Sequence, residues 1–207
     1  IRKKFSVVLE RTVRELRGER CLNIEDSISS KKQIVVSRSF GERVSSLKAL
    51  KPIVSNFAVR AAEKLRNEKQ KCSQVSVFVR TSPFNKNKPQ HSDIKTIKLF
   101  TPTNDTRDIL VAAKKGLLPI FRLGYDYAKA GIILNNFSNE LIMQRSLFKD
   151  PNEPKENTKF MRYIDQMNTY ENQIYFASQN IKRWSPMKQN MTSPKYTTNW
   201  YELPKVN

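Results

Sequence analysis

The sequence predicts an α+β fold built on a four-stranded sheet of βαββαβ order, with two helices on one face. Four segments between residues 33 and 137 have the β-branched or alternating composition of strands. Two helical patterns interrupt these segments at the positions that a split βαβ arrangement requires. The 207 residues suffice for one medium domain or two small ones, so a short N-terminal helix and a small mixed C-terminal domain are expected beside the sheet.

The first half of the chain predicts a helix, a linker, a strand and a second helix. Residues 4–17 place apolar side chains near helical spacing. Residues 22–32 are polar and have no period, which is typical of a linker. The β-branched run "QIVVSRSF" at 33–40 predicts a strand. Residues 47–69 carry one apolar stripe with steps of three and four, which predicts a long helix.

The next elements complete the predicted sheet. Residues 73–82 alternate strictly, with Val75, Val77 and Val79 on one face. A loop at 82–93 leads to a second alternating strand at 94–101. A helix then opens near 103–108, where either Thr103 or Asp105 can cap it. The segment "YAKAGIILNNF" at 127–137 predicts the last strand, with Ala128, Ala130, Ile132 and Leu134 on one face.

The C-terminal region has less regular patterning. Residues 149–158 are linker-like, 158–168 predict a short helix, and "QIYFAS" at 173–178 predicts a short strand. The tail at 193–204 holds Tyr196, Trp200 and Tyr201 among proline and threonine. This is too little to bury a core alone. The region either packs on the main domain or folds on a partner.

The charge of the chain points to a polyanionic partner. Lys and Arg number 38 and Asp and Glu number 19, which gives a formal net charge of +19. Such a balance favours DNA, RNA or an anionic surface, although a ribosome-like or merely soluble basic protein is the alternative. No stretch approaches the roughly 18 apolar residues of a membrane span. The sequence therefore predicts nucleic-acid binding and no membrane partner.

The sheet face opposite the helices is predicted to be basic. Alternation places Ser76, Arg80, Thr96, Lys98 and Lys129 on this face, which has three cations and no carboxylate. Hydroxyls and cations on a twisted sheet can follow a phosphate backbone without reading bases. The alternative is the ordinary polar outer face of a half-buried sheet.

In the first predicted strand, the direction of one side chain, that of Arg38, is not settled by the alternation. Arg38 shares parity with Ile34 and Val36, which are expected to face the core. Either the strand ends or bulges there, or Arg38 points elsewhere.

No catalytic constellation is evident in the sequence. The chain has a single histidine, His91, and two isolated cysteines, Cys21 and Cys72, so zinc ligation is not expected. The five glycines form no phosphate-binding loop. The carboxylates lie in linkers or near helix starts, where they serve as caps and dipole partners. The chain reads as a binding module.

Several long motifs carry a resemblance to the UmuC-type proteins of the Y family of translesion DNA polymerases. They lie in collinear order along nearly the whole chain and are "ERTVRELRGERC" (10–21), "SRSFGERV" (37–44), "RAAEKLRNEKQ" (60–70), "FVRTSPF" (78–84), "TPTNDTRDI" (101–109) and "YAKAGIILNNF" (127–137). The tail "SPKYTTNWYELP" resembles the short C-terminal domain of these proteins.

The resemblance implies a domain map. Residues 1–20 resemble the end of the thumb, 21–33 the tether, 34–137 the little finger, 138–157 a linker with a clamp-binding motif, and 158–207 the small C-terminal domain. The little finger grips damaged or primer-template DNA in the major groove. This agrees with the predicted basic face, and the residues predicted to bind DNA are Ser37, Arg38, Ser39, Arg43, Ser76, Arg80, Thr81, Thr96, Lys98 and Lys129.

The resemblance also implies a cellular role. UmuC-type polymerases act in DNA repair and SOS mutagenesis in the bacterial cytoplasm, with the UmuD′ dimer and RecA as partners. Their Mg²⁺ ions and metal-binding carboxylates belong to a palm that would precede Ile1. This chain is therefore expected to hold no cofactor and not to be catalytic alone, whether it is a truncated gene product or a fragment.

The motif "QRSLF" at 144–148 matches the family's sliding-clamp peptide Gln-Leu-(Ser/Asp)-Leu-Phe. Gln144, Ser146, Leu147 and Phe148 agree with it, whereas Arg145 replaces an apolar residue. The alternative is that Leu147 and Phe148 close the core of the little finger.

Two other function classes remain in view. A chain without a palm could be a non-catalytic regulator that competes for DNA, the clamp, UmuD′ or RecA. An RNA-binding sheet of the RRM kind has the same element order, but it needs exposed aromatics in a defined strand motif, and the corresponding strand here offers only Phe78.

Overall fold

A computed structural model describes residues 2, 4–21, 30–85, 87–140, 158–171, 174–179 and 191–203. The chain divides into two compact units, Ile1–Lys31 and Lys32–Asn207. In the first unit, helix α1 runs over Val7–Leu16, and the side chain of its N-cap Ser6 accepts a hydrogen bond from the Leu9 amide at 3.2 Å. None of the residues of α1 is buried.

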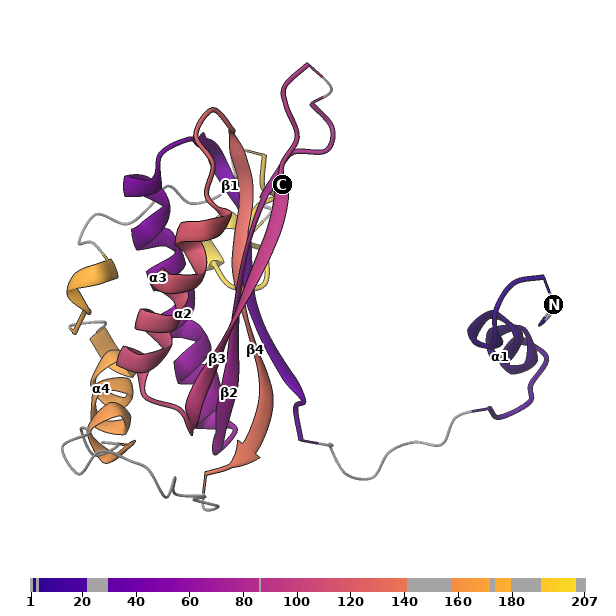
Figure 1. Cartoon of the computed structure of the whole chain (residues 1–207). Coiled ribbons are helices and arrows are strands. Elements are labelled where there is room, and N and C mark those ends of the chain that lie inside the picture. Colours follow the sequence, from indigo (N-terminus) through magenta and orange to yellow (C-terminus); the bar gives the residue numbers. More distant parts are fainter. Residues whose placement is uncertain are drawn as a thin grey trace. The chain divides into compact units, whose positions relative to one another are not determined.

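The second unit is a four-stranded antiparallel sheet covered on one face by two helices (Figure 1). The strand order is β1-β4-β2-β3. The elements are β1 (Gln33–Val44), α2 (Leu47–Asn67), β2 (Gln70–Thr81), β3 (Ser92–Thr103), α3 (Thr106–Ile120) and β4 (Tyr127–Asn139). The predicted α+β fold with βαββαβ order is confirmed, and each strand extends beyond at least one of its predicted ends.

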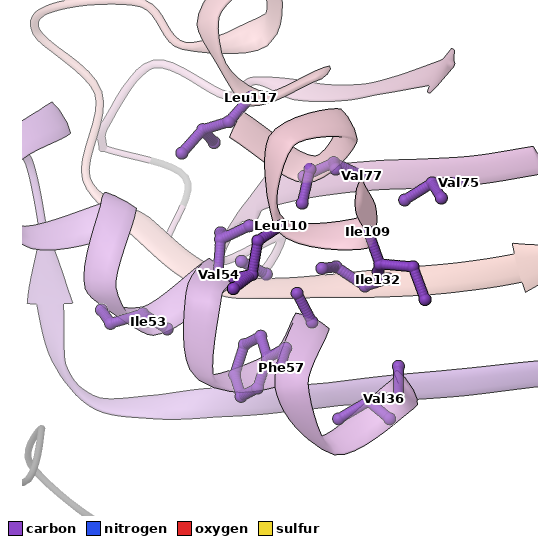
Figure 2. Packing of buried hydrophobic residues seen from close by; sticks show 14 of the residues in the cluster. Val36, Ile53, Val54, Phe57, Val75, Val77, Ile109, Leu110, Leu117 and Ile132 are labelled. Atoms are coloured by element: carbon purple, nitrogen blue, oxygen red, sulfur yellow. The ribbon is translucent and has the colours of Figure 1, made fainter. Parts of the chain in front are cut away.

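The helix-facing side of the sheet forms the core. Val75, Val77 and Val79 of β2 are fully buried, as the alternation predicted. Figure 2 shows Val75, Val77 and Ile132 of the sheet facing side chains of α2 and α3. Burial of these side chains from water supplies the main favourable term in folding.

Side-chain caps fix the starts of both covering helices. The Ser46 side chain accepts from the Ala49 amide at 3.3 Å at the start of α2. Asp105 is the N-cap of α3 and accepts from the Arg107 amide at 2.8 Å. Thr103, the other candidate cap, instead accepts from the Asp105 amide at 3.0 Å. Each cap satisfies a backbone N–H that has no partner within the helix.

Helix α4 (Thr158–Glu171) lies beside the covering helices, on their side away from the sheet (Figure 1), and its Asp165 pairs with Arg66 of α2. Met161 and Ile164 of α4 are buried. Of the two alternatives for the C-terminal region, packing on the main domain therefore holds for this helix. The helix predicted over 158–168 is confirmed and extends three residues further.

The strand predicted over 173–178 is wrong. The residues Ile174, Tyr175 and Phe176 have no regular structure, and Ala177–Gln179 form a short 3-10 helix, η1. The segment lies against α2, where the Asn56 side chain donates to the Gln179 carbonyl at 3.1 Å. Contact with a helix supplies no strand edge, so the β-type composition of this segment does not produce a strand.

The last described element is a second 3-10 helix, η2 (Trp200–Glu202). Within the described part of the chain, no helix is long and apolar enough to cross a membrane.

Candidate nucleic-acid interface

The face of the sheet opposite the helices, called the outer face here, is organised in rows that cross all four strands. Residues paired across antiparallel strands point to the same face, so the register fixes the members of each row. The four rows are Ser39–Lys129–Arg80–Ser92, Ser37–Gly131–Phe78–Ile94, Val35–Ile133–Ser76–Thr96 and Gln33–Asn135–Gln74–Lys98. No Asp or Glu belongs to any of these rows.

The first row, called the cationic row, contains two adjacent cations between two hydroxyls. Lys129 on β4 is paired with Arg80 on β2, and these two strands are the inner strands of the sheet. Ser39 and Ser92 stand beside them on the edge strands and are exposed. Among the described residues, none forms an ion pair with Arg80 or Lys129. Their charges are therefore available to an anionic ligand.

The second row is apolar and close-packed. A Cβ atom added to Gly131 would lie 2.5 Å from the Ser37 Cβ and 2.6 Å from two ring atoms of Phe78. The Phe78 ring therefore lies directly against the Gly131 backbone. Ile94, on the other side of Phe78, is 53% exposed. This row gives the outer face a tightly packed apolar band beside the cationic row.

The remaining two rows are held by side-chain hydrogen bonds. The Ser76 and Thr96 hydroxyls lie 2.8 Å apart, and Ser76 is buried whereas Thr96 is exposed. In the last row, the Gln33 amide donates to the Asn135 side-chain carbonyl at 2.7 Å. The hydroxyl of Thr96 and the ammonium of Lys98 are thus the polar groups that these rows present on β3.

The structure brings most of the predicted DNA-binding residues together on the outer face. They are Ser37, Ser39, Ser76, Arg80, Thr96, Lys98 and Lys129. Three predicted residues, Arg38, Thr81 and Arg43, lie elsewhere.

Arg38 is paired with Ala130 and so belongs to the helix-facing side of the edge strand β1, where it is exposed. The register runs without a shift from Gln33 to Ser39, so the strand neither ends nor bulges at Arg38. Its parity with Ile34 and Val36 is therefore real.

Thr81 and Arg43 lie beyond register shifts at the end of the sheet. Thr81 is buried and paired with Tyr127, and its hydroxyl accepts from the His91 amide at 3.0 Å and donates to Gln90 at 2.7 Å. Thr81 thus anchors the loop between β2 and β3. Arg43 lines a shallow pocket against this loop, together with Lys88 and Asp126.

Ser92 is a member of the cationic row that the sequence did not reveal. The second strand of the hairpin was predicted to begin at residue 94, but β3 begins at Ser92. The same alternation that selected Thr96 and Lys98 would have selected Ser92 if the strand had been extended by two residues. Phe78 and Gly131 were also missed, because their contact depends on strand order, which the sequence alone did not fix.

The described residues contain no group of three or more His, Cys, Asp or Glu side chains that could hold a metal ion. The predicted clamp-binding residues Gln144, Arg145, Ser146, Leu147 and Phe148 lie outside the described residues.

Comparison with known proteins gives two family matches. Residues 31–147 match the impB/mucB/samB family C-terminal domain, and residues 158–206 match a domain of unknown function, DUF4113.

Several curated proteins are similar over nearly the whole chain. The chain is 46% identical over 208 residues to the protein UmuC of Salmonella typhimurium, covering 100% of this chain and 49% of that protein. It is 45% identical to ImpB of Salmonella typhimurium and 46% identical to MucB of Escherichia coli, each over 205 residues, covering 99% of this chain and 48% of each protein. The chain thus spans about half the length of the curated relatives it matches.

Among solved structures, a complex of the beta-clamp processivity factor and the little finger domain of PolIV matches 56% of this chain and 99% of its own, with 14% sequence identity and a TM-score of 0.37.

Proposed function

The chain belongs to the impB/mucB/samB family through the C-terminal domain of that family, and from this premise we propose that its outer face binds the backbone of duplex DNA. In this proposal residues 34–137 serve as the little finger of a UmuC-type translesion polymerase. They would hold damaged or primer-template DNA without carrying out catalysis themselves.

The observation that carries the proposal is the cationic row. Arg80 and Lys129 lie side by side between Ser39 and Ser92, and the four residues come from the four strands in the order in which these neighbour one another in the sheet. Neighbouring strands lie about 4.8 Å apart, so the row is roughly 14 Å long. Phosphate oxygens accept hydrogen bonds from guanidinium, ammonium and hydroxyl groups alike. A row of this length can contact successive phosphates of one DNA strand.

The outer face is poorly suited to reading base sequence. Direct readout in the major groove relies on Asn, Gln or Arg side chains that make bidentate contacts with base edges. On the outer face the Gln33 and Asn135 amides are bound to each other at 2.7 Å, and the proposal assigns Arg80 to phosphate, so Gln74 is the one side chain of these types in the four rows that is left for bases. Binding is therefore expected to depend on salt and to be nearly independent of sequence, as a polymerase that moves along DNA requires.

The test is the salt dependence of duplex binding. Each phosphate neutralised contributes about −0.9 to the slope of log K against log[salt]. We expect the Arg80→Gln/Lys129→Gln variant to flatten this slope by about 2. The matched control is Lys114→Gln/Lys115→Gln, which removes the same charge from exposed positions of α3 on the helical side. If both variants flattened the salt slope equally, binding would depend on net charge alone, and the proposal would be contradicted.

We further propose that Gln144–Phe148 bind a sliding clamp. The support is the match to the clamp-binding pattern, in which two apolar side chains fill a preformed pocket. Such a peptide alone would bind at about micromolar affinity, and coupling to DNA binding would raise the effective affinity.

Clamp binding of the intact chain, compared with a Leu147→Ala/Phe148→Ala variant, tests this motif. Equal affinity would remove the motif from consideration. Arg145→Leu restores the apolar residue of the pattern and is expected to tighten binding.

The cellular role is proposed from the relatives as whole proteins. In this view the chain contributes DNA gripping and clamp tethering to error-prone synthesis during SOS mutagenesis, with UmuD′ and RecA as partners. Support for a partner at the tail is the exposure of Trp200 and Tyr201, which are 86% and 99% exposed. Unchanged capture of both proteins by a Trp200→Ala/Tyr201→Ala variant would contradict this part.

The alternative role is a non-catalytic regulator that competes for the same ligands. The genomic sequence upstream of Ile1 separates the two roles. An open frame that encodes a palm supports a polymerase, whereas an in-frame start near Ile1 supports a regulator.

A further inference from the structure

Arg66 of α2 is a buried cation whose partners lie on α4, at the first residue of α3 and just before α3. Its side chain is 3% exposed, and burial of a charge is costly unless it is paired and hydrogen-bonded. Its Nε and Nη2 donate to the two carboxylate oxygens of Asp165 on α4 at 2.5 and 2.6 Å. Its Nη1 donates to the Asn104 carbonyl at 2.8 Å and the Thr106 hydroxyl at 2.9 Å.

These contacts define a site, called the carboxylate socket here, that consists of Arg66, Asn104 and Thr106. The two parallel bonds from Arg66 have the fork geometry that makes guanidinium–carboxylate recognition directional. Asp165 is 19% exposed, so the pair differs from solvent-exposed pairs, which contribute little. Met161 and Ile164, which lie four residues and one residue before Asp165 on α4, are buried.

A second set of contacts holds residues 174–179, which follow α4, against α2 and the core. Asn56 of α2 and Gln179 exchange two hydrogen bonds, at 3.1 and 3.0 Å. Phe176 packs against the hydrophobic core. The Asn168 amide bonds to both the N–H and the carbonyl of Ile174, at 2.9 and 3.0 Å, and so holds the end of α4 to the segment that follows.

A third set of contacts joins α4 to the end of β4. The Asn104 side chain donates to Glu140 at 3.3 Å and accepts from the Thr158 hydroxyl at 3.4 Å. Arg162 of α4 donates to the other carboxylate oxygen of Glu140 at 2.6 Å. The residues that flank 141–157 thus meet at one buried side chain.

From these contacts we infer that the N-terminal part of the domain of unknown function, residues 158–171 and 174–179, is an intramolecular ligand of the helical layer. It docks through the carboxylate of Asp165 into the socket formed by Arg66, Asn104 and Thr106. The described parts of the two segments that match separate family domains, 31–147 and 158–206, therefore share one folded unit. The helical layer is occupied by α4 on the side opposite the candidate DNA surface.

The test is hydrogen exchange of the full chain, resolved by peptide. Asp165→Asn keeps the shape of the side chain and removes its charge. Because a hydrogen bond to a charged group contributes about 1.5–3 kcal/mol, the amides of α4 are expected to exchange about 10- to 100-fold faster than in the wild type. Arg66→Lys keeps the charge and loses the fork, so it is expected to have a similar effect.

The matched control is Lys159→Gln, because Lys159 is exposed on α4 and takes no part in the socket. It is expected to leave exchange unchanged. The inference also predicts that Arg66→Lys and Asp165→Asn together have less effect than the sum of the two alone.

Wild-type α4 amides that exchange as fast as an unstructured peptide would overturn the inference. So would unchanged protection in Asp165→Asn. Loss of protection in β2 and β4 together with α4 in Asp165→Asn would support the inference, because it would show that the sheet and α4 unfold as one unit. None of these readouts involves DNA, so the result is independent of the proposed function.

Discussion

At the scale of single residues, Gly131 is the position on which the outer face depends most. It lies between Ser37 and Phe78 in one cross-strand row, and the Phe78 ring occupies the space that a side chain would need. An aromatic ring that covers a strand glycine compensates for the packing that glycine lacks. The apolar band beside the cationic row is therefore specified by a pair of residues.

We predict that Gly131→Ala lowers the free energy of unfolding by about 1–3 kcal/mol, the usual cost of overpacking. The Phe78 ring can move, but the Ser37 Cβ at 2.5 Å is fixed to the backbone of β1. Urea denaturation would show a lower midpoint with an unchanged m-value.

Ser37→Gly in the Gly131→Ala background is the matched control for this prediction. It removes one of the two clashes and should recover part of the lost stability. No difference between wild type and Gly131→Ala would contradict the close packing of this row.

Cys72 gives a prediction on pH dependence. Burial raises the pKa of its thiol to about 12. An unfolded thiol has a pKa near 8.5–9, so between about pH 9 and 12 the unfolded chain binds fewer protons at this site than the folded chain. This site therefore contributes full stability below that range and loses its contribution as pH rises through it.

The checking measurement for Cys72 is alkylation by iodoacetamide followed by mass spectrometry. In native protein, the Cys72 peptide should remain unmodified at about pH 7 and at about pH 9, because the thiolate is the nucleophile. The Cys21 peptide, from a partly exposed thiol, serves as the internal control. Native labelling of Cys72 at the rate of urea-unfolded chain would contradict its burial.

At the scale of elements, the start of α3 is held by the buried carboxylate of Asp105. It caps the Arg107 amide and also accepts from the Arg107 guanidinium at 2.6 Å, a contact that raises the pKa of Arg107. We predict that Asp105→Ala lowers the free energy of unfolding by about 1–2 kcal/mol, as loss of an N-cap does.

Asp105→Asn separates the cap from the charge. Asparagine caps as well as aspartate, and Arg107 is half exposed, so this variant should cost less than about 1 kcal/mol. Thermal or urea unfolding measures both variants. An equal loss in Asp105→Asn and Asp105→Ala would show that the ion pair, and not the cap, matters.

The elements that the sequence predicted well are those whose pattern is enforced by burial. The alternation of Val75, Val77 and Val79 gave the correct face of β2, and with it the outward position of Arg80. Thr81 shares the parity of Val79 and is buried, so alternation itself did not support its place among the predicted DNA-binding residues. The strand expected at 173–178 failed for another reason, since its composition suits a strand but its neighbour is a helix.

At the scale of the whole molecule, the second unit presents two different surfaces. The outer face offers cations and hydroxyls. The helical layer instead binds α4, whose Asp165 accepts from Arg66 in the socket. Sites that share no partners usually contribute additively. The sequence predicted the first surface because alternation orders it, and it missed the second because Arg66 and Asp165 are 99 residues apart.

Because the two surfaces share no residues, each variant should change either the hydrogen exchange of α4 or the salt slope of DNA binding, and not both. Asp165→Asn should accelerate exchange in α4 and leave the salt slope of DNA binding unchanged. Arg80→Gln/Lys129→Gln should flatten that slope and leave α4 protection unchanged. Measuring both quantities on both variants checks this, and a salt slope that moves with Asp165→Asn would mean that the two surfaces communicate.

The meeting of Glu140 and Thr158 at Asn104 has a mechanical consequence. Glu140 and Thr158, the described residues on either side of 141–157, are held at the same side chain, so tension applied to these two residues is divided between two anchors. One anchor is the end of β4, and the other is α4 with its Arg66–Asp165 pair. Tension that reaches Glu140 and Thr158 would therefore pull on the end of β4 and on α4 at once, and after a single cut between them both residues would still be bound to Asn104.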